Sequence, residues 1–277
     1  MNTRWNSPAP LRTTTVGEHR LTYLPDGAVQ IDPRRWYPRT EPSLWDEKYA
    51  HLLDPGGYLT GSIGGLLVEH GDRAMLIDAG FGPRSIPAAH THPALGVLAG
   101  GDLLTSLKQT GVEPERIDTV AFTHLHDDHF GWVLRPGPEG TPFRGAEIVA
   151  GAADWSAWRE PVAVRAKAVR DGEAVFPGVT ALAAPGHTPG HTCYVIASGG
   201  ERLIAIGDAL HSAAQAAHPE WPVLMDVDQA RGIETRRKVL DALGEDRTRA
   251  FAIHFADTQF GRVLQGEDGP YWEPDED

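Results

Sequence analysis

The sequence predicts an α/β fold built on mixed sheets, and three observations support this. Short apolar segments typical of strands alternate with helical segments along most of the 277 residues. Several predicted strands follow one another directly, as in hairpins, so we expect antiparallel pairs beside parallel ones. Hydrophobic residues make up 41% of the chain, which is enough for a sizeable core. Because no short repeat, low-complexity tract or linker divides the chain, we expect a single domain over residues 1–277.

Residues 1–60 are the least regular part of the chain and are expected to form an N-terminal arm. Residues 1–18 are rich in Pro and Thr, which predicts irregular structure. Residues 19–31 alternate around the tripeptide Pro25-Asp26-Gly27, which predicts a strand, a turn and a second strand. A proline opens residues 42–53, which predict a short helix.

Two long loops, residues 33–60 and 81–100, are large enough to cover a functional site. The aromatic residues of the first loop form either a lid that lines an apolar substrate pocket or a small satellite core beneath the loop. Aromatic side chains supply core packing more often than ligand contacts, which favours the satellite core. These candidate pocket residues are Trp36, Tyr37, Trp45, Tyr49 and Tyr58.

The pattern becomes regular over residues 61–264, which we expect to form the core of the fold, followed by a C-terminal tail of residues 265–277. Glycines are expected to end two of its helices and Asp154 to cap the third. The predicted strands are residues 66–69, 74–77, 119–123, 147–150, 179–183, 193–197, 203–206, 250–253 and 261–264. The predicted helices are residues 103–110, 154–159 and 228–243.

Composition excludes several classes of function. The formal net charge is −13, whereas a protein that binds nucleic acid needs a basic face for the phosphates. The chain has one cysteine, Cys193, so neither an intrachain disulfide nor a cysteine-based zinc finger can form, and we expect this thiol to be buried. The N-terminus lacks the apolar region of a secretory signal, and no apolar run approaches the ~18 residues of a membrane span. We therefore expect a cytoplasmic protein without a nucleic-acid or membrane partner.

A dense cluster of metal-binding residue types follows the predicted strand that ends near residue 123. His124, His126, Asp127, Asp128 and His129 fall within six positions. Alternate residues of an extended stretch face the same side, so His124 and His126 can point at one ion. The chain then turns, and Asp128 and His129 can reach a second ion. Imidazole and carboxylate groups are the expected ligands of zinc, and so many imidazoles placed together cost stability unless something binds them.

Further candidate ligands stand where other predicted strands end. His187 and His191 follow the strand that ends near residue 184, Asp208 follows residues 203–206, and His254 follows residues 250–253. In α/β folds, ligands bind at the carboxyl ends of strands. These coincidences therefore strengthen the prediction of a metal site at one sheet edge.

Over residues 61–264 the combined motifs resemble the metallo-β-lactamase fold hydrolases. The resemblance implies a four-layer αβ/βα sandwich with mixed sheets and with the metal ions at one edge. It rests on the order of the motifs along the chain and on Asp78 in Leu76-Ile77-Asp78-Ala79-Gly80. The ligand set that it implies is His124, His126, Asp128, His129, His187, Asp208 and His254.

The resemblance also assigns roles. One ion would be held by His124, His126 and His187, and the second by Asp128, His129 and His254. Asp208 would bridge both ions, while Asp78 and His191 would orient ligands from outside. We expect two divalent metal ions per chain, with Zn²⁺ the first candidate, although the same ligands accept Fe, Mn or Co.

Two metal ions about 3.5–4 Å apart can share a hydroxide that exists at neutral pH and attacks a carbonyl or phosphoryl centre. Asp128, or a water beside it, would pass a proton to the leaving group. The last third of the chain is most similar to the lactonase and methyl parathion hydrolase branch of the family. The segments that carry this similarity are residues 207–211, 254–255, 260–263 and 271–272.

His211 departs from the pattern of the best-known acyl-homoserine lactonases, which place a tyrosine three residues after the bridging aspartate. A histidine there is the pattern of the phosphotriesterase-like members. The His211 side chain either contacts the substrate, as a second catalytic candidate beside Asp128, or satisfies a hydrogen bond. The leading interpretation is a hydrolase of lactones or carboxylic esters, with phosphotriesters as a side activity.

Three other interpretations remain open. A thioester hydrolase of the glyoxalase II type and an iron-dependent persulfide dioxygenase share the fold, and metal content would separate the dioxygenase. A non-catalytic metal-binding scaffold is disfavoured by the complete ligand set. The expected partner is a small-molecule ester or lactone, and the resemblance hints at a homodimer.

Overall fold

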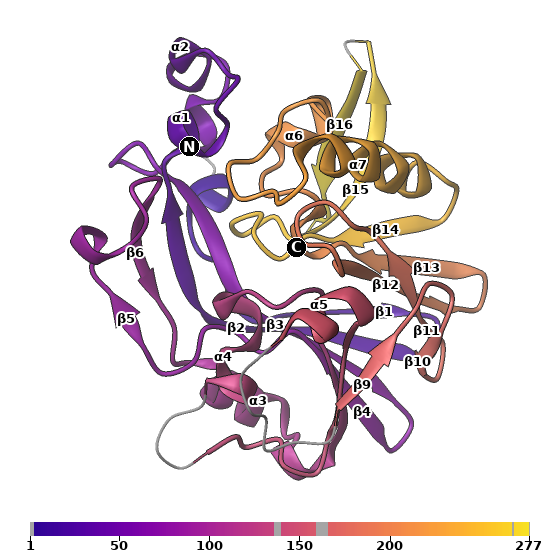
Figure 1. Cartoon of the computed structure of the whole chain (residues 1–277). Helices are drawn as coiled ribbons and strands as arrows, with labels where there is room; N and C mark the ends of the chain where they lie inside the picture. The colour runs from indigo at the N-terminus through magenta and orange to yellow at the C-terminus, as the bar shows by residue number, and fades with distance from the viewer. Residues whose placement is uncertain (1–2, 136–139, 159–165, 268, 277) are drawn as a thin grey trace.

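The computed structural model describes residues 3–135, 140–158, 166–267 and 269–276. In this part of the chain, two mixed sheets face each other, the first drawn from indigo through magenta to salmon and the second from salmon to yellow in Figure 1. The first sheet runs in the order β5-β6-β2-β3-β4-β7-β8-β9, with β1 paired to β2. The second runs β10-β11-β12-β13-β14-β15-β16. Parallel pairs join β4 to β7, β7 to β8, β8 to β9 and β13 to β14, and the other pairs are antiparallel.

The strands of the first sheet are β1 (Arg12–Val16), β2 (His19–Ile31), β3 (Leu59–His70), β4 (Arg73–Ile77), β5 (Ser85–Ile86), β6 (Leu95–Ala99), β7 (Ile117–Ala121), β8 (Glu147–Gly151) and β9 (Ala166–Val169). Those of the second are β10 (Ala174–Phe176), β11 (Val179–Ala183), β12 (Thr192–Ser198), β13 (Glu201–Ala205), β14 (Thr248–Phe251), β15 (Phe260–Gly266) and β16 (Gly269–Pro274). The α-helices are α1 (Pro33–Trp36), α2 (Pro42–Asp46), α3 (Leu103–Thr110), α4 (Asp127–Leu134), α5 (Ala152–Ala157), α6 (Ala214–Ala217) and α7 (Gln229–Leu243).

Three buried clusters define the layers. One lies between the sheets and combines residues of β2, β3 and β4 with residues of β11 to β14. A second joins the outer face of the first sheet to α3 and α4, and a third joins the outer face of the second sheet to α7. Figure 1 shows α3 and α4 on one side of the molecule and α7 on the other. The predicted αβ/βα sandwich with mixed sheets is therefore confirmed.

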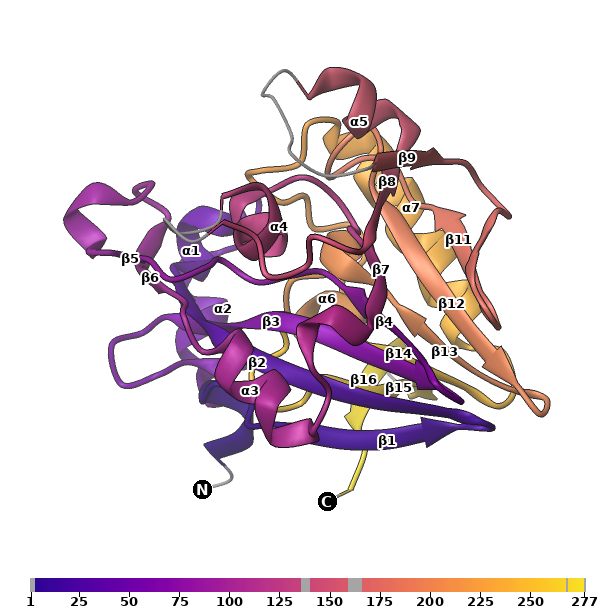
Figure 2. The same cartoon turned by 90° about the horizontal axis from the view of Figure 1, so that it is seen from below.

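The two sheets approach each other closely at one end of the sandwich. At this end the backbone N–H of Glu18, between β1 and β2, donates to the Ser198 hydroxyl at the end of β12 over 3.1 Å. Figure 2 shows β1 running toward the same end as the β12–β13 turn. Strands β7, β13 and β14 run in the opposite direction, so their carboxyl ends lie at the far edge. Most of the residues predicted to bind metal follow these three strands, and His187 follows β11, which runs in the same direction as β13.

Several elements confirm the local predictions. Helix α3 has the predicted bounds and ends at Gly111, whose φ of 77° lies in the left-handed region that favours glycine. Strands β3 and β4 form the predicted hairpin, with Leu66 opposite Ile77. Helix α7 begins after Asp228, whose carboxylate accepts the N–H of Arg231.

The predicted turn at residues 25–27 is wrong. Strand β2 continues through it and pairs with β3 on both sides, with a bulge between Pro25 and Gly27. Asp26 is buried, and its carboxylate accepts N–H groups from Phe81, Gly82, Gly101 and Leu103 and from the Trp132 indole. The sequence does not distinguish an aspartate in a solvated turn from a buried aspartate that accepts hydrogen bonds. The difference depends on donors from distant parts of the chain.

Other irregular segments of the prediction contain strands. Residues 12–16 of the expected arm form β1, residues 95–99 of an expected loop form β6, and residues 269–274 of the expected tail form β16. Each is stabilised by pairing with a neighbouring strand rather than by its own apolar pattern. The helix predicted for residues 154–159 begins earlier, at Ala152, so Asp154 lies inside α5 and is not its cap, while Arg159 lies outside the described residues. No helix among the described residues is long and apolar enough to cross a membrane.

Candidate metal centre

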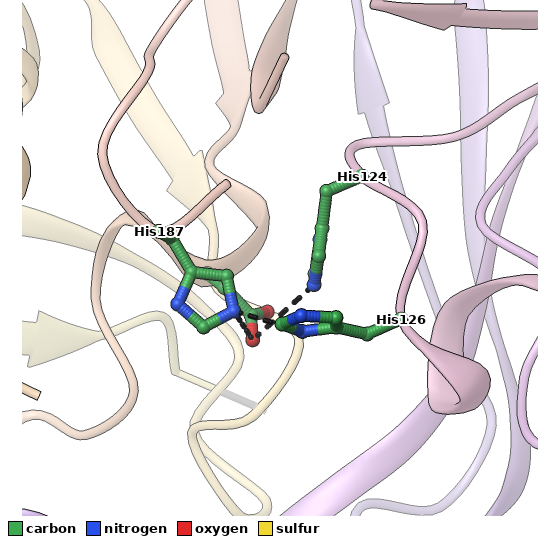
Figure 3. A group of neighbouring side chains, drawn as sticks. His124, His126 and His187 are labelled. Atoms are coloured by element: carbon green, nitrogen blue, oxygen red, sulfur yellow. Dashed lines mark hydrogen bonds and ion pairs between the residues drawn. The ribbon is translucent and has the colours of Figure 1, made fainter. Parts of the chain in front are cut away.

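The structure brings all seven predicted ligands together at the open edge of the sandwich. His124 and His126 follow β7, and α4 begins at Asp127, so its first turn carries Asp128 and His129. The remaining three come from the second half of the chain, where His187 lies between β11 and β12, Asp208 follows β13 and His254 follows β14. Figure 3 shows His124, His126 and His187 pointing toward one another.

The candidate ligands form two groups, within each of which one donor atom per residue lies within 4.8 Å of the others. The first ligand group is His124, His126, His187 and Asp208, and the second ligand group is Asp128, His129 and His254. Asp208 also reaches the second group, because its Oδ1 lies 3.3 Å from His129 Nε2 and 3.2 Å from His254 Nε2, while its Oδ2 lies 3.3 Å from His187 Nε2. One carboxylate therefore stands between the two groups.

The proton positions on three histidines test whether these residues fit a metal ion. The Nδ1 of His129 lies 2.9 Å from Asp78 and that of His187 lies 3.0 Å from Asp226, while the Nδ1 of His254 lies 2.9 Å from the carbonyl of Ser62. Because carboxylate and carbonyl oxygens only accept, each Nδ1 carries a proton, and each ring directs its Nε2 toward the cluster. A metal ion bound there would be coordinated through these Nε2 atoms.

The distances between facing nitrogens fit a metal ion bound between them. The Nε2 atoms of His129 and His254 face each other at 3.3 Å, and His187 Nε2 lies 3.1 Å from His126 Nδ1. Two further buried acceptors, His124 Nε2 and Asp208 Oδ1, have no hydrogen-bond partner among the described residues. Since buried polar groups are nearly always satisfied, these atoms fit metal ligands in both groups.

The electrostatics favour positive charge at the centre of the cluster. Burial lowers the pKa of His124 well below its usual range, and burial together with neighbouring His187 lowers that of His126 to about 4. Burial also opposes charge on His129, but Asp208, Asp128 and Asp78 outweigh it and raise its pKa well above the usual value. For Asp208, burial is outweighed by His254 and His129, which lower the pKa well below its usual range. A bound metal ion would supply the positive charge that this arrangement favours.

Asp78 occupies the position predicted for it outside the second ligand group. It has a φ of 60°, in the left-handed region that residues other than glycine rarely adopt. Its carboxylate accepts the N–H of Thr123 at 2.8 Å and also contacts the Thr123 hydroxyl. The side chain that orients His129 is thus itself fixed by the segment that carries the ligands.

His191 lies outside both ligand groups but holds the Asp208 backbone. Its Nδ1 donates to the carbonyl of Ala184 at 3.1 Å, so its Nε2 is free to accept the N–H of Asp208 at 3.0 Å. The residue before Asp208 must be small, because a Cβ on Gly207 would lie 2.8 Å from His191 Nε2. This contact fixes the backbone that presents the shared carboxylate.

Two supporting aspartates were missed by the sequence analysis. Asp226, in the irregular segment before α7, orients His187. Asp154, on α5, accepts the Thr188 hydroxyl and the Gly190 N–H, both at 2.6 Å, and so holds the loop that carries His187. No motif surrounds Asp226, so the sequence offers no signal for it. Asp154 was noticed only as a helix cap.

A cavity of about 420 Å³ opens beside the ligands. Its floor includes His126, Asp128 and Asp208, and His211 also lines it, with Nε2 3.1 Å from Asp208 Oδ2. Its wall is mostly apolar, and Asp127 and Arg135 also line it. The apolar lining residues are Val29, Ile31, Trp36, Leu95, Leu98, Leu125, Phe130, Trp158 and Met225.

Of the five aromatic candidates for the pocket, Trp36 lines this cavity. Tyr37 and Trp45 are fully buried and stack at 5.2 Å in a cluster that also contains Trp36, Tyr49 and Trp221. Tyr58 lines none of the described cavities. For most of these five aromatic residues, burial of the large apolar ring determines where the side chain lies. These residues form a satellite core beneath the loop rather than a lid.

This core also supports the candidate site. The Tyr37 hydroxyl donates to Ser212 at 2.9 Å, and the Gln215 side chain accepts the N–H of His211 at 2.7 Å. Trp36 contacts the His211 ring edge-on at 5.4 Å. The aromatic segment therefore positions His211 as well as lining part of the pocket.

The chain is similar to proteins of known activity. An N-acyl homoserine lactonase from Bacillus cereus is 29% identical over 164 residues, which are 52% of this chain and 62% of that relative. Among solved structures, the dizinc quorum-quenching lactonase AidC superposes with a TM-score of 0.82 at 22% identity, covering 98% of this chain and 99% of AidC. The hydrolase AbOPH of the β-lactamase superfamily superposes with a TM-score of 0.78 at 24% identity, also covering 98% and 99%.

At these identities the two structural likenesses establish the shared fold. The family membership follows from the sequence. Residues 65–251 match the protein family described as "Metallo-beta-lactamase superfamily". This range begins in β3 and ends with β14, and it includes every strand that leads into the first ligand group. The chain therefore belongs to the metallo-β-lactamase superfamily.

Proposed function

We propose that the protein is a dinuclear metal-dependent hydrolase that cleaves lactones or carboxylic esters whose acyl group is apolar. The observation that carries this proposal is the set of facing ring nitrogens around Asp208 at the floor of a mostly apolar cavity. The lactonase relatives support the reaction class, and the AidC structure holds a lactone-derived product, N-hexanoyl-L-homoserine. Zinc is the first candidate metal because imidazole ligands dominate the cluster.

Two bound metal ions would supply a hydroxide nucleophile at neutral pH and would polarise the substrate carbonyl. The residues of the chain do the rest. The pocket places the acyl group against Ile31 and Leu98, which leaves the ester carbonyl facing the ligand groups. Water is displaced from the apolar wall at the same time, which strengthens the electrostatic interactions at the reacting carbonyl.

Asp128 is the candidate proton carrier. Its side chain is 24% exposed at the cavity floor, with Oδ2 3.6 Å from His254 Nε2. Burial opposes its ionisation, but His129 and His254 lower its pKa, so the side chain is an ionised carboxylate at neutral pH. After hydroxide adds to the carbonyl carbon, Asp128 would take the proton of the added hydroxyl group and pass it to the alkoxide that leaves as the ester C–O bond breaks.

His211 is the candidate for contact with the substrate carbonyl or leaving oxygen. Its backbone is fixed through Gln215, and its ring lines the cavity together with Asp128. Such a donor, held in place before the reaction, stabilises charge that develops on oxygen. The same residue type would also serve a phosphoryl oxygen, so phosphotriesters are the expected side activity.

The apolar wall favours an acyl group over a charged peptide thiol such as glutathione, since Arg135 is the one cationic residue that lines the cavity among the described residues. Metal content measured by elemental analysis, with a panel of γ-lactones, phenyl acetate, a paraoxon-type triester and a glutathione thioester, tests the proposal. We expect about two zinc ions per chain with lactone or ester turnover. About one iron ion per chain, with oxygen consumed on a persulfide and no ester turnover, would assign the oxidative chemistry instead.

A chain-length series tests the acyl subsite separately. Each methylene buried in the cavity contributes about 0.8 kcal/mol, so kcat/KM is expected to rise about 4-fold per methylene until the cavity is full. Leu98→Asn should flatten this rise, because Leu98 lines the cavity. Val97→Asn is the matched control, since Val97 is on the same strand but 42% exposed and outside the cavity lining. A series that stays flat in the unaltered protein would place the acyl group elsewhere.

A further inference from the structure

Two buried charged side chains, one in the irregular segment of residues 219–228 and one on α7, have no role in the proposed chemistry. Asp226 has a side chain only 1% exposed, and Arg236, on α7, is equally buried. Burying a charged pair is costly unless its geometry satisfies all of its donors and acceptors. The contacts of this pair lead directly to the first ligand group.

The Asp226 carboxylate connects a ligand histidine to a buried cation. Its Oδ1 accepts the Nδ1–H of His187 at 3.0 Å, and its Oδ2 lies 3.4 Å from Arg236 Nη2. The backbone repeats the connection, since the N–H of Val227 donates to the carbonyl of His187 at 3.1 Å. His187 is therefore fixed by this segment through both its ring and its main chain.

Arg236 in turn fixes three separate parts of the site. Its Nε donates to the carbonyl of Ala209, next to Asp208, at 2.9 Å. Its Nη1 donates to the carbonyls of Pro219 and Trp221, both at 2.9 Å. A guanidinium has five donors in one plane, so a single side chain can hold the Asp208 turn, the start of the segment and Asp226 together.

The same segment forms part of the pocket wall. Met225, beside Asp226, lines the cavity, and the N–H of Leu224 donates to the carbonyl of Trp36 at 2.9 Å. The site is closely built here, because a Cβ on Gly232 would lie 2.9 Å from Asp226 Oδ2. A displacement of Asp226 would therefore move both a candidate metal ligand and the wall that contacts the substrate.

We propose that Asp226 and Arg236 are positioning residues that hold the His187 ring toward the first metal ion and couple metal binding there to the pocket wall at residues 219–227. This inference rests on the proposed dinuclear site. The partner of a metal-bound histidine fixes its tautomer and orientation, and loss of such a partner typically weakens metal binding by about 10- to 100-fold.

The test is a site-resolved metal titration of the full chain, with ¹¹³Cd as the probe and its two NMR resonances assigned by His187→Ala and His254→Ala variants. Asp226→Asn should weaken the first-group site by about 10- to 100-fold and leave the second unchanged. Asp78→Asn is the matched control, because Asp78 orients His129 in the same way and should weaken only the second site. Arg236→Lys keeps the positive charge but loses the forked donors of the guanidinium. It should therefore weaken metal binding by the first ligand group less than Asp226→Asn does.

Hydrogen exchange measures the coupling to the wall. In Asp226→Asn, backbone amides of residues 219–227 should exchange faster at limiting metal and recover at saturating metal, whereas in Asp78→Asn they should not change. Equal loss at both sites, or unchanged affinity at the first, would overturn the inference while leaving the dinuclear site intact. If the unaltered protein gives no two-site binding, the proposed function fails first.

Discussion

The two ligand groups are fixed in different ways. In the second group, His129 is oriented by Asp78 at the end of β4, and His254 by the backbone carbonyl of Ser62 in β3. Both orienting groups belong to the first sheet. In the first group, His187 is oriented by Asp226, which lies in an irregular segment and depends on Arg236 of α7.

This difference distinguishes a ligand group that is supported from the first sheet from one whose supporting segment also forms part of the pocket wall. The second group rests on strands whose pairing is fixed by the interior of the sheet. The first group shares its supporting segment with the pocket wall at Met225, so occupation of the pocket and of the first metal site should influence each other. Asp208 stands between the two groups and belongs to both.

Loss of the Asp208 carboxylate should impair metal binding in both ligand groups and so remove the difference between them. Asp208→Ala removes the contacts to His187, His129 and His254 at once. We expect metal content to fall at both sites and turnover to be abolished, a larger effect than the about 10- to 100-fold typical of an outer partner. Elemental analysis and turnover of the best substrate measure this. Full activity in the variant would disprove the dinuclear arrangement.

Removal of a ligand from the second group should leave a metal ion bound in the first group. His254→Ala eliminates a ligand of the second group while the first keeps three histidines and Asp208. We expect about one metal ion per chain after dialysis and a large loss of kcat, since the substrate would meet only one ion. His90→Ala is the control, because His90 is exposed and outside both groups. Loss of both ions from the His254 variant would show that the groups load as one unit.

The two groups should also differ in their preference for hard and soft ions. The first combines three imidazoles with Asp208, whereas the second has two imidazoles with Asp128 as well as the shared carboxylate. Carboxylate ligands suit manganese and imidazoles suit zinc. In a mixture of Zn²⁺ and Mn²⁺, electron paramagnetic resonance of Asp128→Asn should show less bound manganese than that of the unaltered protein. The same manganese signal in both proteins would mean that ligand type does not distinguish the groups.

The smallest effect is expected at Cys193, in the sheet that carries Asp208. Its thiol is buried, and burial raises its pKa to about 12. Because the pKa is raised, the reactive thiolate is only about one part in ten thousand at pH 8 and grows only as the pH approaches 12. A thiol reagent should therefore react negligibly at pH 8, with or without a chelator. Rapid reaction after chelation alone would show that the second sheet opens when the metal ions leave.

Local sequence patterns point to the same candidate ligands that the fold brings together, and the reason is physical. The cluster at residues 124–129 has its ligands within one strand end and one helix start, so a short stretch of chain fixes most of the geometry. His187, Asp208 and His254 were found because each follows a buried apolar strand. Asp226 follows no strand and stands in no motif, and its role depends on a helix residue ten positions later.

The sequence by itself determined the layered α/β class, the ligand types and their places at strand ends, because strand periodicity and residue chemistry are local properties. Only the tertiary structure decided which aspartates serve as supports. Asp26 was taken for a turn and Asp154 for a helix cap, yet both carboxylates accept N–H groups from distant segments. A buried carboxylate is stabilised by whichever donors the folded chain brings to it, and those donors are set by packing rather than by the neighbouring residues in the sequence.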